Sequence, residues 1–280
     1  MRRYAVLPVF VFLASAAVAQ EPPPPPIELD LAPGSRLVEP RADELLRKMS
    51  DRLARAGAFT LEAEEVYDEV PEQSPRQQLT ATRHVTVRRP DRLAGEVTGD
   101  ALNRTFKYDG KVFSALDNEQ NVWASGTVPA NIDEALDWVF DQTGTVIPLA
   151  DFLYADPYSR LMDTVQRGVY LGIHEAAGVP CHHLSFEQAT IDWQIWIDAG
   201  ADPLPRKLVI AYKTEDEVPQ YSVTIRKWNF GAKAPDELFR FTPPKGATRV
   251  EIPAFGQTGA EEAPVVTPAK KPEGRQEEKR

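Results

Sequence analysis

Three neighbouring residues, Cys181, His182 and His183, have side chains that could bind a metal ion or pair a nucleophile with a base. The sequence around them predicts a β-strand, in which neighbours point to opposite faces, so Cys181 and His182 cannot converge on one atom. Cys181 and His183 share a face, but a zinc site needs more donors, and none stands at a recognised spacing. We therefore expect no metal here and interpret His182, beside Leu184 and Phe186, as a hydrogen-bonded core histidine.

Acidic residues could supply general acid–base chemistry, since Asp192 precedes Trp193 and Asp133, Glu134 and Asp137 form a run. The chain has 42 acidic residues, so chance proximity is common, and a solvated helix face explains the run. The sequence contains no Gly-x-Ser-x-Gly, His-Glu-x-x-His or Walker motif. We expect a protein that is not an enzyme and that holds no cofactor or metal.

Arg89 is the charged residue whose predicted position fits a solvent-exposed surface least well. Residues 81–90 read as a β-strand, and strand alternation puts Arg89 on the same face as Val85 and Val87. A guanidinium on an apolar face is costly unless it finds partners. Two interpretations are open: an arginine at a strand end whose head group turns to water, or a polar latch at the mouth of an apolar cavity.

The composition and the N-terminal sequence indicate an exported, acidic protein. A basic start, the apolar run Tyr4–Val18 and the small residues up to Ala19 predict a signal peptide over residues 1–19, with Gln20 as the mature start. Losing two arginines with that peptide moves the formal net charge from −10 to −12. Such a charge argues against a nucleic-acid partner, and no stretch reaches the ~20 apolar residues of a membrane span. We expect a soluble periplasmic protein of a Gram-negative cell.

The rest of the chain divides into a linker, one domain and a tail. Residues 20–39 form a Pro-rich linker, 40–255 a single domain, and 256–280 a charged tail that we expect to be disordered. With one cysteine, the domain cannot contain an intramolecular disulfide and must be held by core burial.

Apolar periodicity within the domain predicts a helix, about five strands, two or three helices, and about five more strands. The first helix begins at Pro40 and ends before Gly57, and a later one is capped by Asn131 and ended by Gly144. Further helical stretches are expected over 148–154 and 156–167. The first strands are expected from Phe59, through the Arg89 strand, around Leu93–Val97, over Thr105–Ala115 as a hairpin, and over 121–124; the later ones over 168–175, 181–188, 192–198, 206–213 and 220–230. This order predicts an α+β fold with an antiparallel sheet and helices on one side.

The Asp109-Gly110 pair predicts the turn of the Thr105–Ala115 hairpin. A two-residue turn there pairs Tyr108 with Lys111 and Phe106 with Phe113, so that two aromatic rings meet across the strands.

Three segments resemble the periplasmic carrier that shuttles lipoproteins to the outer membrane: Val87–Leu93, Tyr108–Phe113 and Phe239–Gly246. Most of Arg41–Ile252 is covered by a resemblance that is closer still to an uncharacterised family of predicted periplasmic proteins with the same lipoprotein-localisation-factor-like fold. The resemblance implies a strongly curved antiparallel sheet, an incomplete β-barrel, whose open concave side is covered by helices. It also implies that acyl chains lie between sheet and helices and that Arg89, the arginine of the Arg-Pro motif, hydrogen-bonds the lid backbone and holds the empty cavity shut.

The residues expected to line the ligand space are apolar, apart from Arg89, and lie on the sheet or on the helical lid. Of the five tryptophans, Trp138 is the best candidate for ligand contact, and core filling explains the others. The full set is Arg89, Val87, Leu93, Phe106, Phe113, Leu136, Trp138, Val139, Phe140 and Phe152.

The leading hypothesis is a periplasmic carrier of a hydrophobic ligand, such as a lipid, an acyl chain or a lipoprotein. The alternative is a non-transporting envelope sensor or scaffold that binds a protein partner, which large side chains filling the space between sheet and helices would favour. A hydrolase, the third possibility, would need converging polar groups in a pocket.

Overall fold

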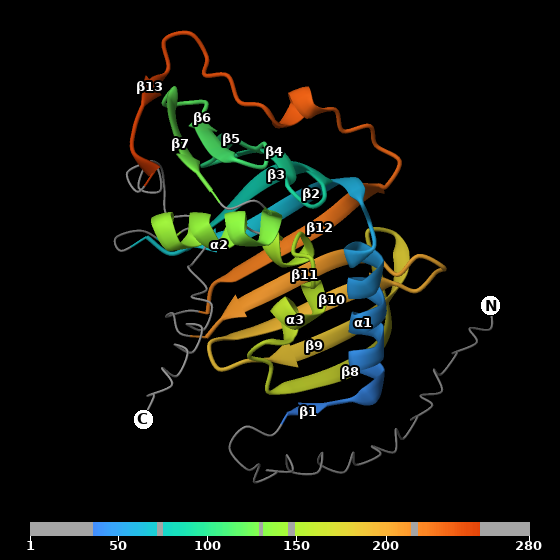
Figure 1. Ribbon diagram of the computed structural model, residues 1–280. Helices are drawn as coiled ribbons and strands as arrows, with labels where there is room; N and C mark the ends of the chain where they lie inside the picture. The colour runs from blue at the N-terminus through green and yellow to red at the C-terminus, as the bar shows by residue number, and fades with distance from the viewer. Residues whose placement is uncertain (1–35, 72–74, 129–130, 145–148, 214–217, 253–280) are drawn as a thin grey trace, which may run out of the picture. The chain divides into compact units, whose positions relative to one another are not determined.

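The computed structural model describes residues 36–71, 75–128, 131–144, 149–213 and 218–252 (Figure 1). The predicted signal peptide, most of the linker and the predicted tail lie outside these residues, so the domain boundaries stay predictions. The described residues are mostly β, with few helices, and their strands form one large, curved, open sheet of 13 strands.

The strands follow the predicted sequence order, with two short additions at the sheet edges. Their bounds are β1 (Leu37–Val38), β2 (Ala58–Glu69), β3 (Gln77–Arg88), β4 (Arg92–Gly99), β5 (Asn103–Tyr108), β6 (Val112–Asp117), β7 (Val122–Thr127), β8 (Arg167–Ala176), β9 (Val179–Glu187), β10 (Ile191–Asp198), β11 (Pro205–Tyr212), β12 (Gln220–Asn229) and β13 (Thr248–Arg249). The helices are α1 (Pro40–Ala54), α2 (Ile132–Thr143) and α3 (Pro157–Met162), with 3₁₀ turns η1 (Ala150–Phe152) and η2 (Asp236–Phe239).

The sheet order is β1-β8-β9-β10-β11-β12-β2-β3-β4-β5-β6-β7-β13. Its halves, β2–β7 and β8–β12, are antiparallel meanders, and β12 joins them by pairing with β2. The two-residue strands β1 and β13 pair in parallel with β8 and β7 at the edges. The predicted antiparallel sheet is therefore confirmed over its eleven long strands, while the join between its halves was not predicted.

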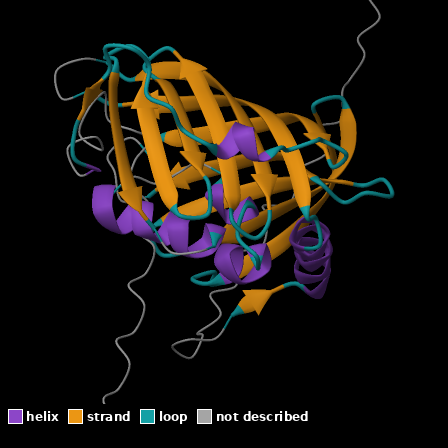
Figure 2. Ribbon diagram, turned by 45° about the horizontal axis from the view of Figure 1, so that its top comes forward, coloured by secondary structure: helices purple, strands orange, loops and turns teal. Residues whose placement is uncertain are grey.

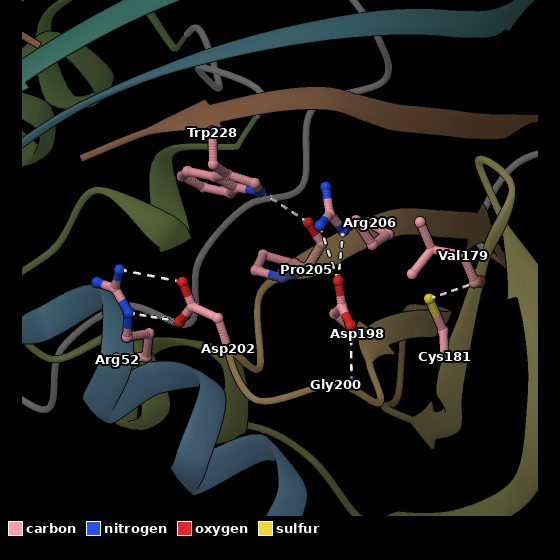
Figure 3. Close-up of polar contacts among 9 residues, drawn as sticks. All are labelled: Arg52, Val179, Cys181, Asp198, Gly200, Asp202, Pro205, Arg206 and Trp228. Atoms are coloured by element: carbon pink, nitrogen blue, oxygen red, sulfur yellow. Dashed lines mark hydrogen bonds and ion pairs between the residues drawn. The ribbon is translucent and has the colours of Figure 1, made fainter. Parts of the chain in front are cut away.

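Helix α1 is attached to the sheet through its apolar face and one ion pair. Its buried residues include Leu45, Leu46, Met49 and Leu53, the positions that the sequence periodicity predicts. Arg52 on α1 donates two hydrogen bonds to the carboxylate of Asp202, in the loop between β10 and β11, at 2.6 and 3.2 Å (Figure 3). The helix also contacts β8 and β10, so it is fixed to one half of the sheet.

The segment between β7 and β8 carries α2, η1 and α3, which we call the helical connection. Asn131 accepts a hydrogen bond from the backbone N–H of Glu134 at 2.8 Å, and Gly144 ends α2 in the left-handed conformation, so both predicted caps are confirmed. In Figures 1 and 2, α1, α2 and α3 lie in front of or below the strands on one side. Their buried apolar residues belong to the same hydrophobic cluster as the inward-facing strand residues.

The register predicted for the β5–β6 hairpin is wrong: the turn lies one residue later in the chain, so each β5 residue pairs with a β6 residue two positions further on. Tyr108 pairs with Phe113 and Phe106 with Ala115. The cause is the Asp109 carboxylate, which accepts hydrogen bonds from the backbone N–H groups of Lys111 and Val112, so Asp109 opens the turn and Gly110 takes its first central position with φ +92°. The rings of Phe106 and Phe113 still stack diagonally, with centroids 6.4 Å apart.

Gly95 makes room for the Phe106 ring and should tolerate no side chain. It lies opposite Phe106 on β4, where an added Cβ would come within 2.3 Å of a ring carbon and 2.9 Å of the His84 carbonyl oxygen. We expect Gly95→Ala to lower the free energy of unfolding by ~1–3 kcal/mol, because the core must be overpacked. Urea unfolding should show this loss, while Gly57→Ala, with open space around it, should show a much smaller change. Equal effects of the two substitutions would contradict this packing.

Candidate functional site

Arg89 lies one residue beyond β3, on the inward face that alternation predicts. Its guanidinium donates hydrogen bonds to the backbone carbonyls of Leu153 at 2.7 Å and Tyr154 at 2.8 Å, directly after η1. Its own backbone N–H donates to the Gly57 carbonyl at 2.8 Å. The head group therefore does not turn to water, and it makes the backbone contacts that the resemblance implies.

The Arg89 side chain is half-buried, and only part of its hydrogen-bonding capacity is used. Burial lowers the pKa of Arg89, and the nearby carboxylate of Asp133 opposes that effect. The Nε atom is buried and has no hydrogen-bond partner among the described residues. Two carbonyl dipoles thus replace part of the lost hydration of the charge, and the buried Nε–H is left without an acceptor among the described residues.

Further polar contacts tie the helical connection together beside Arg89. The Asp133 carboxylate, at the start of α2, accepts from the Ala155 N–H at 2.9 and 3.2 Å. The Tyr154 hydroxyl donates to Asp137 at 2.7 Å and receives a hydrogen bond from Arg160 at 3.1 Å. The two ends of the connection are therefore fastened to each other just where Arg89 holds it to the end of β3.

The contact between α3 and α1 is also polar at its surface. The Tyr158 hydroxyl donates to Asp43 on α1, and Arg47 on α1 donates to that hydroxyl at 2.6 Å. The Arg47 guanidinium also lies over the Tyr158 ring, 3.8 Å from its centroid. Exposed contacts of this kind contribute on the order of 0–1 kcal/mol each, so they can be broken at modest cost.

Most of the residues predicted to line a ligand space are buried together in one hydrophobic cluster. The cluster includes Val87, Leu93, Phe106, Phe113, Leu136, Val139 and Phe152. Trp138 is half-buried at its edge, with its ring over Gly126 of β7, and Phe140 is half-buried outside the cluster. The structure thus brings seven of these apolar residues together, and their contact with a ligand stays a prediction.

A hollow of ≈ 270 Å³ lies elsewhere, on β2, β3 and β4. Its lining includes Glu64, Val66, Thr80, Thr82 and Thr98, all of which alternate with the inward-facing residues. It is therefore mainly on the polar face of the sheet, although Glu65 and Ala81 of the inward face also line it.

The Cys181–His183 segment is built into the sheet as a structural element. The Cys181 thiol is buried and donates to the Val179 carbonyl at 3.3 Å (Figure 3). His182 faces inward and is hydrogen-bonded to the Tyr170 hydroxyl at 3.1 Å, as predicted, but it is half-buried and is not a core residue. His183 contacts His174 at 2.8 Å on the other face, a neighbour that sequence reasoning missed. Within the described residues, no three metal-binding side chains come together.

Sequence reasoning also missed a buried ion pair on the inward face. Arg83 of β3 donates to the two carboxylate oxygens of Glu65 on β2 at 2.5 and 3.2 Å, and both side chains are buried. A signal was available, because each residue occupies an inward position in an otherwise apolar alternation: Leu61 and Ala63 precede Glu65, and Val85 and Val87 follow Arg83.

The sequence of residues 42–253 matches the family described as "Predicted periplasmic protein (DUF2092)". The chain belongs to this family. The assignment confirms the resemblance to predicted periplasmic proteins. A search of curated proteins finds no match.

Several solved structures are similar at low identity. An uncharacterised conserved protein from Thermus thermophilus is 11% identical, with a TM-score of 0.45, over 75% of this chain and 99% of its own. Lipoprotein LppX from Mycobacterium tuberculosis is 12% identical, with a TM-score of 0.41, over 70% and 98%. The Pseudomonas aeruginosa MucA/MucB complex contains a chain that is 14% identical, with a TM-score of 0.38, over 72% of this chain and 61% of that one.

Among the described residues, none of the helices has the length and apolar character needed to cross a bilayer.

Cys181 should be chemically inert in the folded protein. Burial, with a contribution from Asp198, raises the pKa of Cys181 to about 11, and only the thiolate is an efficient nucleophile. We expect iodoacetamide at pH 8 to alkylate the native thiol at least ~100-fold more slowly than the thiol of the unfolded chain. Mass spectrometry of timed samples, with and without guanidinium chloride, measures both rates. Similar rates in the two states would contradict the burial of this side chain.

Proposed function

We propose that the protein binds a hydrophobic ligand, a lipid, an acyl chain or the acyl chains of a lipoprotein, between the sheet and its helices, and carries it through the periplasm. The observation that supports this most directly is Arg89. Its charged side chain lies at the border of the apolar cluster and, among the described residues, donates its hydrogen bonds to backbone carbonyls of the helical connection. These hydrogen bonds join the end of β3 to the helical connection without adding apolar packing, so they can break and re-form as the connection moves.

In this proposal the helices cover the concave side of the sheet, with α1 fixed and the helical connection acting as a lid. Helix α1 is anchored by its apolar face and by the Arg52–Asp202 pair. The helical connection is held by Arg89, by the polar contacts of Tyr154 and Tyr158, and by its own buried apolar residues. Its polar contacts exchange readily for contacts with water, and in this proposal the apolar groups of the ligand replace its apolar contacts, so the lid opens while α1 stays in place.

Binding would be driven by burial and would need no covalent step, cofactor or metal. Each methylene of an acyl chain removed from water stabilises the complex by ~0.8 kcal/mol. The apolar side chains that now pack against each other, including Phe106, Phe113 and Phe152, would contact the ligand once the lid has moved. In this proposal the arrangement described above is the closed state of a two-state carrier.

The export signal predicted over residues 1–19 belongs to the same proposal. Cleavage before Gln20 would release the domain into the periplasm, where an apolar cargo must be shielded from water.

A second candidate is a non-transporting sensor or scaffold that binds an envelope protein. The observation that favours it is the packing of the seven predicted lining residues against one another, because a permanently filled core leaves no room for cargo. Native mass spectrometry of protein purified from the periplasm separates the two candidates. Co-purified lipid supports carriage, whereas a lipid-free chain in complex with a protein supports the scaffold.

Removing the hydrogen bonds of Arg89 to the helical connection should favour the open state. Arg89→Leu removes two hydrogen bonds from a charged donor, each worth about 1.5–3 kcal/mol. We therefore expect a fluorescent fatty-acyl probe to bind roughly tenfold more tightly, or better, because a larger fraction of molecules is open. Fluorescence titration measures the change.

Arg88→Leu is the matched control. Arg88 is the preceding residue, faces the other side of the sheet and bonds the Ala234 carbonyl at 2.7 Å and Asp236 near η2. Its loss changes the charge equally but leaves the helical connection untouched, so probe affinity should not change. Absence of saturable binding would refute the carrier, and equal affinities of the wild-type protein and Arg89→Leu would refute this role of the Arg89 hydrogen bonds.

A further inference from the structure

The inward face of the sheet carries a row of large side chains that sequence reasoning did not connect. Trp193 of β10 pairs with Ile210 of β11, which pairs with Tyr221 of β12, which pairs with Tyr67 of β2. Cross-strand partners lie side by side, so these four residues form one line across the middle of the sheet. All four belong to, or pack against, the hydrophobic cluster.

Three side chains of this row, Trp193, Tyr67 and Tyr221, carry a buried donor without a hydrogen-bond partner among the described residues, and the Tyr221 hydroxyl lies against the Glu65 carboxylate. The Trp193 and Tyr67 side chains are each 3% exposed, and neither the Trp193 Nε1–H nor the Tyr67 hydroxyl has a hydrogen-bond partner within the part of the chain that the structure describes. Leaving a buried donor unpaired costs about 1–3 kcal/mol, and natural proteins rarely retain such groups without a reason. Phenylalanine in place of Tyr67 would keep the apolar contacts of the ring and avoid this cost.

The surroundings of the row are polar, and the charges that act on Tyr67 are those of Glu69, Glu65, Asp100 and Arg83. Glu65 and Arg83 lie on the same inward face, joined by two hydrogen bonds, so neither charge is left uncompensated. Tyr221 lies against Glu65, and burial, followed by this negative charge, raises the pKa of Tyr221 well above its usual value. Burial likewise raises the pKa of Tyr67 to about 12, so its hydroxyl stays protonated and can donate.

We infer that this row is a recognition site for the uncharged, oxygen-bearing head of an acyl ester or amide, whose chains occupy the apolar space proposed above. The inference rests on the proposed function and adds the ligand class to it. The backbones of Tyr67 and Trp193 are three strand spacings apart, about 14 Å, and both side chains project from the same face of the sheet. A ligand with two acyl linkages, such as a diacyl ester, provides one acceptor oxygen for each donor.

These charges select against an anionic head, because three carboxylates and only one guanidinium act on Tyr67. The Arg83 guanidinium is already engaged by Glu65 through both carboxylate oxygens, so a phosphate would have to displace a buried carboxylate or lie beside it. Both options are costly where the dielectric constant is low. A neutral ester meets the donors of Tyr67 and Trp193 and leaves the ion pair intact.

The test compares three fluorescent probes of equal chain length: a neutral diacylglycerol, its phosphate monoester and an alkane without a polar head. With wild-type protein we expect the neutral diester to bind most tightly. Tyr67→Phe should lower the affinity for the diester about five- to tenfold, which corresponds to the loss of one hydrogen bond, and should leave the affinity for the alkane unchanged. Its Tm should be equal or higher, because an unpaired hydroxyl has been removed. Trp193→Phe should act in the same direction on the diester.

Tyr170→Phe is the matched control, since its hydroxyl is already hydrogen-bonded to His182. It should leave the preference for the diester over the alkane unchanged. A Tyr67→Phe protein that binds both probes as the wild type does, or that loses Tm and affinity for both equally, would overturn the inference and assign Tyr67 a packing role. A wild-type preference for the phosphate monoester would overturn the assignment to neutral heads. If no probe binds the wild-type protein, the proposed function itself fails.

Discussion

The satisfaction of one guanidinium by two backbone carbonyls is the interaction on which the arrangement around the helical connection depends. Strand alternation turns Arg89 toward the apolar face, where an unpartnered charge would be strongly unfavourable. The carbonyls of Leu153 and Tyr154 supply the partners, and they do so from a segment that is far away in sequence. The end of β3 and the turn after η1 are therefore held together by the need to solvate a charge.

This constraint explains why polar and apolar contacts have different positions in the fold. The apolar cluster runs from the inward face of both meanders into α1 and the helical connection, and it supplies the bulk of the stabilisation. The polar contacts of Asp133, Tyr154 and Tyr158 lie around its border. In a carrier, a border that opens at modest cost and an interior that accepts apolar groups are complementary requirements. In a scaffold, the same packing would simply be permanent.

The unused donors of Trp193 and Tyr67 stand apart from both patterns. The Glu65 and Arg83 side chains of the inward face meet each other, whereas the indole of Trp193 and the phenol of Tyr67 have no hydrogen-bond partners among the described residues, which has a cost. Both donors lie on the face that the proposed ligand would touch. Their retention has a physical explanation if the ligand brings acceptor oxygens.

The amino-acid sequence by itself determined what depends on local chemistry. Alternation placed Arg89 inward, periodicity identified α1 and the long strands, and the side chain of Asn131 with the permissive backbone of Gly144 set the ends of α2. The tertiary structure decided what depends on partners distant in the chain. The Asp109 carboxylate sets the register of the hairpin, and β12 pairs with β2. Three successive strand pairings align Trp193 with Tyr67. The physical reason is that alternation is a property of one strand, whereas register and the pairing of buried donors arise only when separate strands are assembled against each other.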